Sequence, residues 1–340
     1  MNEYDVRAAF ERIELELIAS MRRNLGRHLA EEQAEGFDWS MWQAEQLKSL
    51  RSYQRNNRKI FKDDFADINR EIKKFLHRNA NNSALNTERD ILNHVFGNAT
   101  SVPTSDFFQA RSDKLDALIR AVNKDMQKAE HAMLRKANDQ YRKVIFNAQI
   151  YANSGAGTLK QSIDMATKDY LRAGLNCITY KNGRTINIAS YAEMAVRTAN
   201  RRAVLTADGE MRRRHGWHTV KVSAYGGCSE TCQPWQGRVY VDDVYSGGTA
   251  AEAQALKLPL LSEAIAGGLF HPNCRHRLTT WFPGMDDSTA IKGPENPPAL
   301  KEHNKNRRMI QRHKRIAAGA LDPQTVATAK HQQGKWAMAD

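Results

Sequence analysis

Apolar side chains recur at steps of three and four residues through the first 150 positions, and this pattern constrains the fold more than any other feature. The first set is Val6, Phe10, Ile13, Leu17, Met21 and Leu25, with similar sets over residues 61–75 and 115–133. Such spacing places side chains on one face of an α-helix. Because strand-like alternation is almost absent here, we expect residues 1–152 to be helical. The apolar faces serve either helix packing alone or docking onto a larger assembly.

Short polar or glycine-containing stretches are predicted to interrupt these helices. They are Gly36, residues 79–83 and residues 97–105, whose composition is typical of helix breaks. Thr87 followed by Asp90 has the spacing of a helix start, in which a side chain caps the first turn. The region is therefore expected to consist of several helices joined by short connections.

The periodicity changes after the helical region. Residues 153–157 are typical of a linker, and a short helix is expected to follow it. Alternating residues over 176–180 and 184–189 then flank Asn182-Gly183, and an Asn-Gly pair in this setting is a strong signal for a β-hairpin.

A further helix and two more strands complete this middle segment. The helix is predicted to end near Ala207, ahead of Asp208-Gly209, and the strands are expected over residues 218–223 and 237–241. Together these elements predict a compact α+β domain over residues 153–285.

The remainder, residues 286–340, is expected to be a linker followed by a basic helical tail. Prolines stand at positions 294, 297 and 298, and residues 301–315 then hold seven lysines or arginines and one acid. The chain as a whole is thus predicted to be α+β, with a helical N-terminal region (1–152), an α+β domain (153–285) and a basic tail (286–340).

The chain is strongly basic. Its 51 lysines and arginines against 38 acids give a formal net charge of +13 over 340 residues, which favours a polyanionic partner, nucleic acid above all. The candidate phosphate contacts are Arg212, Arg213 and Arg214 in the middle segment and Arg307, Arg308, Arg312, Lys314 and Arg315 in the tail. A solvated basic surface without a partner is the alternative.

Composition excludes several classes of protein. Hydrophobic residues make up 41% and charged residues 26%, which is typical of a soluble globular protein. Mean hydropathy is −0.66, and the sequence holds no apolar run of about 18 residues, so no membrane span is expected. The first residues lack the pattern of a secretion signal. Four cysteines are too few for a disulfide scaffold of this length.

Three of the four cysteines stand near two histidines in the middle segment. Cys228 and Cys232 share a glycine-rich loop, and about forty residues later come His271, Cys274 and His276. Thiolate and imidazole are the ligands that a tetrahedral zinc ion prefers, and structural sites are commonly encoded as two short clusters. Four of these five side chains would close a site for one structural zinc ion, and His276 is the favoured histidine.

Other chemistries remain open for this cluster. Cys228 and Cys232 can form a small disulfide, and His271 can serve only as a hydrogen-bonding group. Cys274 beside a histidine has the residue types of a nucleophile and its base. A metal-dependent nuclease is a further alternative, although the clustered carboxylates of such a centre are not evident. The motifs of zinc deaminases, zinc metalloproteases, P-loop enzymes and α/β-hydrolases are absent.

Four motifs follow one another in a distinctive order. They are Tyr191-Ala-Glu-Met-Ala-Val-Arg-Thr198, Val220-Lys-Val-Ser223, Cys232-Gln-Pro-Trp-Gln-Gly-Arg-Val-Tyr240 and His271-Pro-Asn-Cys-Arg-His276. In this order the sequence resembles the tailed-phage minor capsid protein family, also described as phage head morphogenesis proteins. The resemblance is carried by roughly residues 140–285, and it fits the helical N-terminus and the basic tail only loosely.

The resemblance implies a structural protein made in the bacterial host cytoplasm and incorporated inside the phage head, near the portal vertex. Its implied partners are the portal protein, the scaffold or major capsid protein, and packaged double-stranded DNA contacted without sequence specificity. Some members of the family are associated with DNA delivery. The competing hypothesis is an enzyme carried in the virion, either a metal-dependent nuclease or a toxin-like hydrolase.

Overall fold

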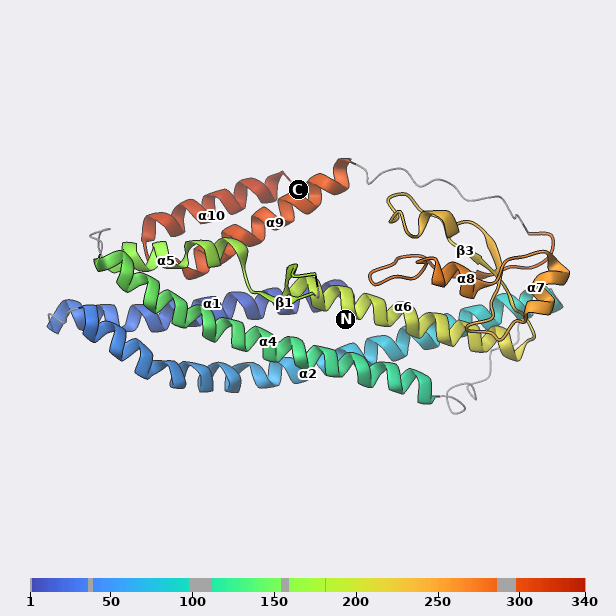
Figure 1. Ribbon diagram of the computed structural model, residues 1–340, viewed down its shortest axis with the longest axis horizontal. Helices are drawn as coiled ribbons and strands as arrows, with labels where there is room; N and C mark the ends of the chain where they lie inside the picture. The colour runs from blue at the N-terminus through green and yellow to red at the C-terminus, as the bar shows by residue number, and fades with distance from the viewer. Residues whose placement is uncertain are drawn as a thin grey trace. The chain divides into compact units, whose positions relative to one another are not determined.

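Long α-helices make up most of the protein. The computed structural model describes residues 2–35, 39–97, 112–153, 159–180, 182–285 and 298–339. The longer helices are α1 (Glu3–Glu35), α2 (Trp39–Phe96), α4 (Ser112–Asn153), α5 (Leu159–Ala173), α6 (Ile188–Arg214), α9 (Pro298–Gly319) and α10 (Pro323–Met338) (Figure 1). The shorter elements are α7 (Ala250–Leu256), α8 (Leu261–Ala266) and the 3-10 turn η1 (Gln233–Trp235).

The strands are short and antiparallel. They are β1 (Asn176–Thr179), β2 (Thr185–Asn187), β3 (Thr219–Val222), β4 (Val239–Val241) and β5 (Leu278–Thr280). β1 pairs with β2, and the other three form a sheet in the order β4-β3-β5. The predicted α+β class, the hairpin and the strands near 218–223 and 237–241 are therefore confirmed, whereas β5 was not expected.

The described chain divides into two compact units. The sheet unit comprises Met1–Glu3, Arg70–Asp125 and Met194–Pro297, and the bundle unit comprises Tyr4–Asn69, Met126–Glu193 and Pro298–Asp340. Helices α2, α4 and α6 therefore each contribute residues to both units. The three segments expected from the sequence follow chain order instead, and they stay a prediction.

Apolar helix faces form the core of the bundle unit. Phe10 of α1 lies against Phe65 of α2, with ring centroids 5.8 Å apart, and Tyr53 of α2 lies 4.6 Å from Tyr141 of α4. All six residues of the first predicted helical face are buried. The helical periodicity is thus confirmed for α1, because the residues at steps of three and four are those that pack inward.

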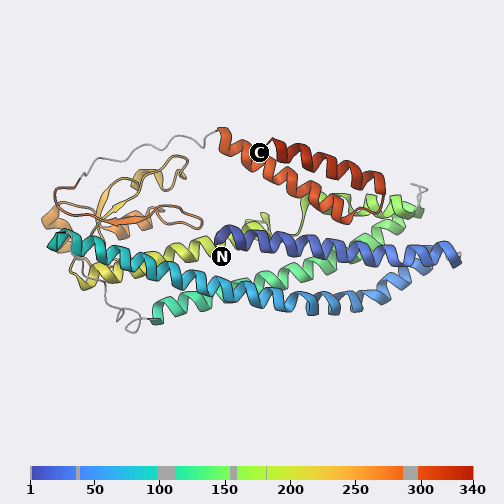
Figure 2. The same cartoon turned by 180° about the vertical axis from the view of Figure 1, so that it is seen from behind.

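Helices α9 and α10 form a hairpin in the bundle unit, and α9 also packs against α5 (Figure 2). The turn between them is fixed by Asp164 of α5, whose two carboxylate oxygens accept hydrogen bonds of 2.8 Å from the backbone N–H groups of Leu321 and Asp322. Asp322 in turn caps the N-terminus of α10. The described part of the basic tail, residues 298–339, is therefore a helical hairpin.

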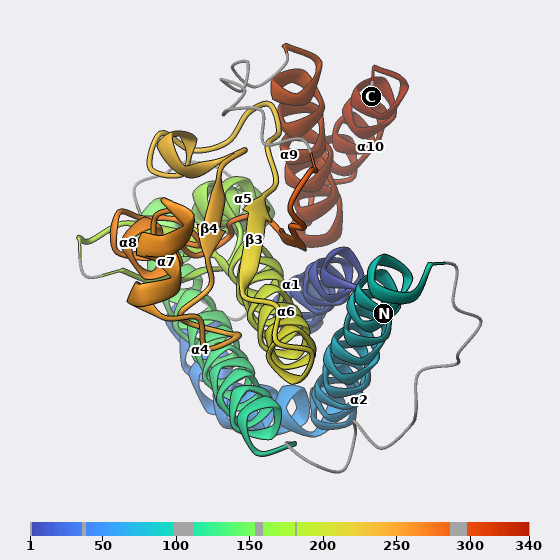
Figure 3. The ribbon, with the colours of Figure 1, turned by 90° about the vertical axis from the view of Figure 1, so that its right-hand side faces the viewer.

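The three-stranded sheet supplies the core of the sheet unit. Figure 3 shows β3 and β4 as neighbouring strands with α7 and α8 beside them. Val220 and Val222 of β3 pack with Leu205 of α6, Tyr240 of β4 and Leu261 of α8, and all of them are buried. Cys232 and Cys274 belong to this same cluster, so the sheet unit places two of the candidate metal ligands in its core.

Two predicted helix breaks are wrong, because packing overrides local propensity. Helix α2 continues through residues 79–83 and through Thr87. In that stretch Ala80 and Ala84 are buried against Ala203 of α6, and Asn79 donates a 3.0 Å hydrogen bond to Asn200.

Helix α6 likewise continues past Asp208-Gly209 to Arg214. Ser83 and Thr87 donate hydrogen bonds to the buried Asp208 carboxylate, and Gly209 allows the backbone of Tyr245 to approach closely. The breaks or linkers predicted at Gly36 and at residues 98–105, 154–157 and 293–297 lie outside the described residues.

Candidate metal centre

Two cysteines and one histidine converge in the sheet unit. Cys232 precedes η1, while His271 and Cys274 lie in the loop between α8 and β5, and their potential ligand atoms all lie within 4.8 Å of one another. Cys232 and Cys274 are 0% and 3% exposed, and His271 is half-buried. This trio can hold a metal ion, and it contains no carboxylate.

The distance between the two sulfurs fits a shared metal. Cys232 Sγ and Cys274 Sγ are 3.7 Å apart, and both cysteines are free. Two thiolates bound tetrahedrally to one zinc at about 2.3 Å would stand about 3.8 Å apart, whereas a disulfide requires about 2.05 Å. Neither sulfur is bonded to Cys228, so the alternative of a Cys228–Cys232 disulfide is not formed in this structure.

Local backbone geometry positions the loop that carries His271 and Cys274. Phe270 and Asn273 have positive φ values of 60° and 71°, which asparagine tolerates and phenylalanine adopts rarely. The Asn273 side-chain oxygen accepts a 2.5 Å hydrogen bond from Arg197, and its backbone N–H donates a 3.0 Å bond to the Thr198 hydroxyl. Helix α6 therefore holds the turn that carries His271.

The orientation of His271 is suited to a ligand. Its Nδ1 lies 2.7 Å from the carbonyl oxygen of Pro272 and its Nε2 lies 2.7 Å from the Ser229 hydroxyl. Because a carbonyl only accepts, Nδ1 carries the proton, which leaves Nε2 with a lone pair. Metal-bound histidines commonly donate their other ring N–H to a backbone carbonyl in this way.

The remaining two predicted ligands border the trio. His276 Nδ1 lies 3.3 Å from Cys274 Sγ, and His276 Nε2 lies 3.3 Å from Gln236 Oε1. Cys228 is half-buried, and its thiol is also hydrogen-bonded with Gln236. The structure thus places His271, and not the favoured His276, within the trio. It leaves Cys228 and His276 as neighbours that Gln236 connects.

Burial dominates the electrostatics of this cluster. It raises the pKa of Cys274 to about 11 and, together with electrostatic interactions with His271 and Arg201, lowers the pKa of His276 to about 4. Both groups are therefore neutral at pH 7 in the metal-free protein. A bound zinc ion would instead keep the cysteines deprotonated, because its charge stabilises thiolates.

Sequence reasoning missed the role of Gln236, whereas a tryptophan that anchors the loop was expected at Trp235. Gln236 is fully buried and also accepts a 3.2 Å hydrogen bond from the backbone N–H of Tyr225. Trp235 donates its indole N–H to the carbonyl oxygen of Gly267, 3.2 Å away, which fixes the turn after Cys232. Gln236 and Trp235 stand in the Cys-Gln-Pro-Trp-Gln-Gly motif, which marked the place in the sequence but not the hydrogen bonds of Gln236.

The predicted phosphate contacts fall into two groups. Arg212 is fully buried beside Asp242, with 3.3 Å between Nη2 and Oδ2, and Arg315 is 8% exposed. These two side chains are not available to DNA, which corrects their assignment.

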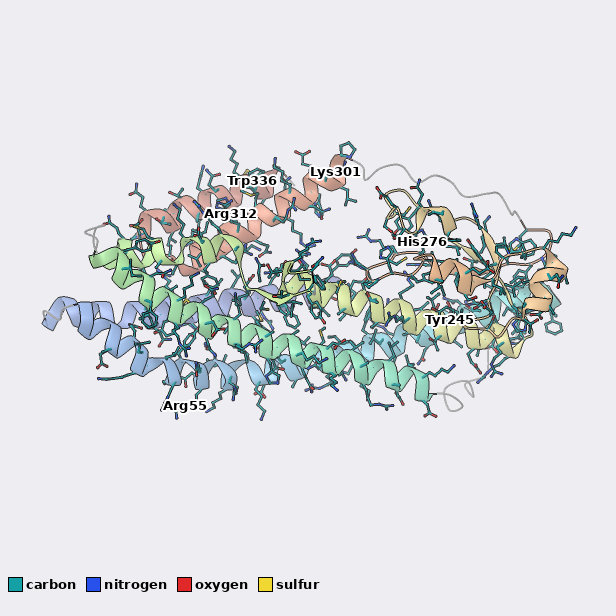
Figure 4. The ribbon with its side chains drawn as sticks, viewed as in Figure 1. Arg55, Tyr245, His276, Lys301, Arg312 and Trp336 are labelled. Atoms are coloured by element: carbon teal, nitrogen blue, oxygen red, sulfur yellow. The ribbon has the colours of Figure 1, made fainter. Side chains whose placement is uncertain are left out.

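The other candidates are at least partly accessible. Arg308 is exposed on α9, Arg307, Arg312 and Lys314 are half-buried on the same helix, and Arg213 and Arg214 are exposed at the end of α6. Glu210 pairs with both Arg213 and Arg214. Figure 4 shows Arg312 and Lys301 on α9 and His276 in the sheet unit.

Comparison with known proteins identifies the family. No curated protein and no solved structure is detectably similar to the chain. The family model of phage minor capsid protein 2 matches residues 3–333, which extends well beyond the segment that carried the resemblance in sequence. None of the described helices has both the length and the apolar character needed to cross a membrane. The chain therefore belongs to the phage minor capsid protein 2 family, as a structural phage head protein that assembles with other head components in the virion.

Proposed function

We propose that this protein is an assembly component inside the head, near the portal vertex, whose sheet unit is held together by one structural zinc ion. Family membership supports the assembly role, and the observation that carries the zinc clamp is the 3.7 Å separation of two buried sulfurs beside an oriented histidine. Cys232, His271 and Cys274 would supply three ligands, and Cys228 the fourth. When bound, zinc would clamp the loop before β5 to the turn before β4.

Zinc content and stability test the clamp. Elemental analysis of the purified full-length protein should give about one zinc per chain, and removal by a chelator should lower the melting midpoint. Metal binding to such a site contributes to folding free energy, so readdition of zinc should restore the midpoint. Metal-free protein that melts at the same temperature as zinc-treated protein would refute the clamp.

We further propose that α9 contacts packaged double-stranded DNA. Support comes from its density of basic side chains, of which Lys301, Lys305 and Arg308 are exposed. Such contacts release counterions, so affinity should fall steeply as salt rises. The contacts would be independent of sequence, because α9 would meet phosphates and not base edges.

The double variant R308Q/K314Q tests this DNA contact. Fluorescence anisotropy with a duplex of about 20 base pairs should show weaker binding than wild type and a salt slope smaller by about two. The charge-matched control R55Q/R58Q removes two exposed arginines from α2 (Figure 4 labels Arg55) and should bind as wild type does. Equal weakening in both variants would indicate only a general effect of net charge.

Portal docking is proposed for the long helices, whose length suits a ring-shaped partner. The test is to co-express the full chain with the portal protein and the scaffold or major capsid protein of the same phage and to isolate complexes. Mass spectrometry of purified heads should also find the chain in few copies. Absence of the protein from purified procapsids and virions would overturn an internal assembly role.

A further inference from the structure

A small cavity with a basic wall lies beside α6 in the sheet unit. Its volume is about 160 Å³. Arg201, Arg202 and Tyr245 supply polar groups, and Leu205, Ile265 and Phe270 supply apolar surface. His271 and Cys274 of the candidate metal centre also border it. The arginines of this cavity are different from those expected to contact DNA.

The guanidinium of Arg201 is incompletely hydrogen-bonded in this position. Its Nη2 donates a 3.3 Å hydrogen bond to the carbonyl oxygen of Arg275, but its Nε is buried without any hydrogen-bond partner. Burial, followed by the nearby positive charge of Arg277, lowers the pKa of Arg201. A guanidinium in such surroundings is destabilised until an anion approaches it.

The acids nearest to Arg201 are already engaged elsewhere. Cys274, Asp208 and Glu3 favour its charged form, but together they contribute less than burial and Arg277 oppose it. Asp208 accepts hydrogen bonds from Ser83 and Thr87, and the Glu3 carboxylate lies 3.7 Å from Arg197 Nε. Both carboxylates are therefore engaged with other groups, and the Nε of Arg201 stays without a hydrogen-bond partner.

We propose that this cavity binds a phosphate group between Arg201, Arg202 and the hydroxyl of Tyr245. The donors belong to two consecutive residues of α6 and to the separate Tyr245 loop, and donors from separate elements suit a tetrahedral oxyanion better than a planar carboxylate. The apolar walls strengthen each contact by lowering the local dielectric constant. The phosphate belongs either to the DNA backbone or to free inorganic phosphate.

The double variant R201Q/R202Q tests the site in the full-length protein. Inorganic phosphate should raise the melting midpoint of wild type above that in sodium chloride of equal ionic strength, because the ligand binds only the folded state. This increment should disappear in R201Q/R202Q. The charge-matched control is R55Q/R58Q, which removes two exposed arginines from α2 and should keep the increment. If R201Q/R202Q does not melt cooperatively, R202Q alone replaces it, since Arg202 is exposed at the edge of the cavity.

Duplex DNA distinguishes the two sources of phosphate. If the ligand is the DNA backbone, R201Q/R202Q should also weaken duplex binding about tenfold or more and reduce its salt slope by about two. If the ligand is free phosphate, duplex binding should be unchanged while the phosphate-induced rise in melting midpoint is lost.

A phosphate-induced rise that persists in R201Q/R202Q would overturn the proposal. So would an equal stabilisation of wild type by acetate that the same variant abolishes, because it would identify a carboxylate site.

Discussion

Arg315 of α9 lies beside the buried Glu14 of α1, with 3.5 Å between Nη1 and Oε2. Its Nε and Nη2 donate 3.0 Å hydrogen bonds to the carbonyl oxygens of Leu171 and Arg172 in the last turn of α5. Glu14 accepts a further bond from the backbone N–H of Leu175. One arginine thus joins α1 and α9 while it satisfies carbonyl groups at the end of α5.

Replacing Arg315 with methionine should therefore strongly destabilise the protein. Glu14 would remain buried without its cation, and breaking one partner of such a pair costs about 3–5 kcal/mol of the free energy of unfolding. Urea unfolding monitored by circular dichroism measures this loss. The control R308M removes an exposed arginine from the same helix and should change stability by no more than about 0.5 kcal/mol. Similar stabilities of R315M and R308M would contradict the role of the pair.

The role of Arg315 shows what charge density in a sequence can reveal. The concentration of basic residues over 301–315 correctly indicated a helix with a basic surface, but it could not distinguish the buried Arg315 from the exposed Arg308. Arg315 is buried because it pairs with Glu14, which lies about 300 positions away in the chain. Periodicity, in contrast, reports burial within a single helix, and it therefore predicted the face of α1 that contains Phe10 and Leu17.

The candidate metal centre was predictable in its residue types but not in its geometry. Cysteine and histidine types at two clustered positions pointed to the two loops from which Cys232, His271 and Cys274 converge. Which histidine joins Cys232 and Cys274 depends on the backbone turn at Phe270 and Asn273, which α6 holds through Arg197. No local pattern encodes that turn, and the role of Gln236 between Cys228 and His276 has the same non-local origin.

Cys228 is expected to complete the proposed zinc site. His276 is fully buried, and both of its ring nitrogens have partners. Cys228 also contacts Gln236, but it is half-buried in a glycine-rich loop and interacts electrostatically with Cys232. The variant C228S should therefore lose zinc to a competing chelator at a concentration at least tenfold lower than wild type, and H276Q should retain zinc more strongly than C228S does. Elemental analysis after dialysis measures both. The reverse order would assign His276 as the fourth ligand.

Gly209 should resist substitution although it lies within a helix. A Cβ atom there would stand 2.4 Å from Tyr245 Cβ and 2.7 Å from its backbone carbonyl carbon. Overpacking of this kind costs about 1–3 kcal/mol, which outweighs the gain of about 1 kcal/mol that alanine brings to a helix. We expect G209A to lower the melting midpoint.

Gly334 provides the matched control for Gly209. It also lies within a helix, α10, but a Cβ atom there meets nothing within 4 Å. The variant G334A should therefore raise stability by about 0.4–1 kcal/mol, as expected for an unobstructed glycine. Thermal unfolding of both variants gives the comparison. Stabilisation in both would show that α6 and the Tyr245 loop are not closely packed.

Asp322 should make the stability of the α9–α10 hairpin depend on pH. Hydrogen bonds from the backbone N–H and the hydroxyl of Thr325 lower the pKa of its carboxyl group. A carboxyl with a lower pKa in the folded state stabilises the protein above its unfolded pKa, and this contribution is lost as pH falls through the folded value. Wild type should therefore exceed D322A in melting midpoint at pH 7, and the difference should shrink between about pH 4 and pH 2. The variant D322N keeps an uncharged cap. The difference in melting midpoint between D322N and D322A should therefore stay constant over that pH range. A difference between wild type and D322A that is equal at pH 7 and pH 2 would show that the charge of Asp322 contributes nothing.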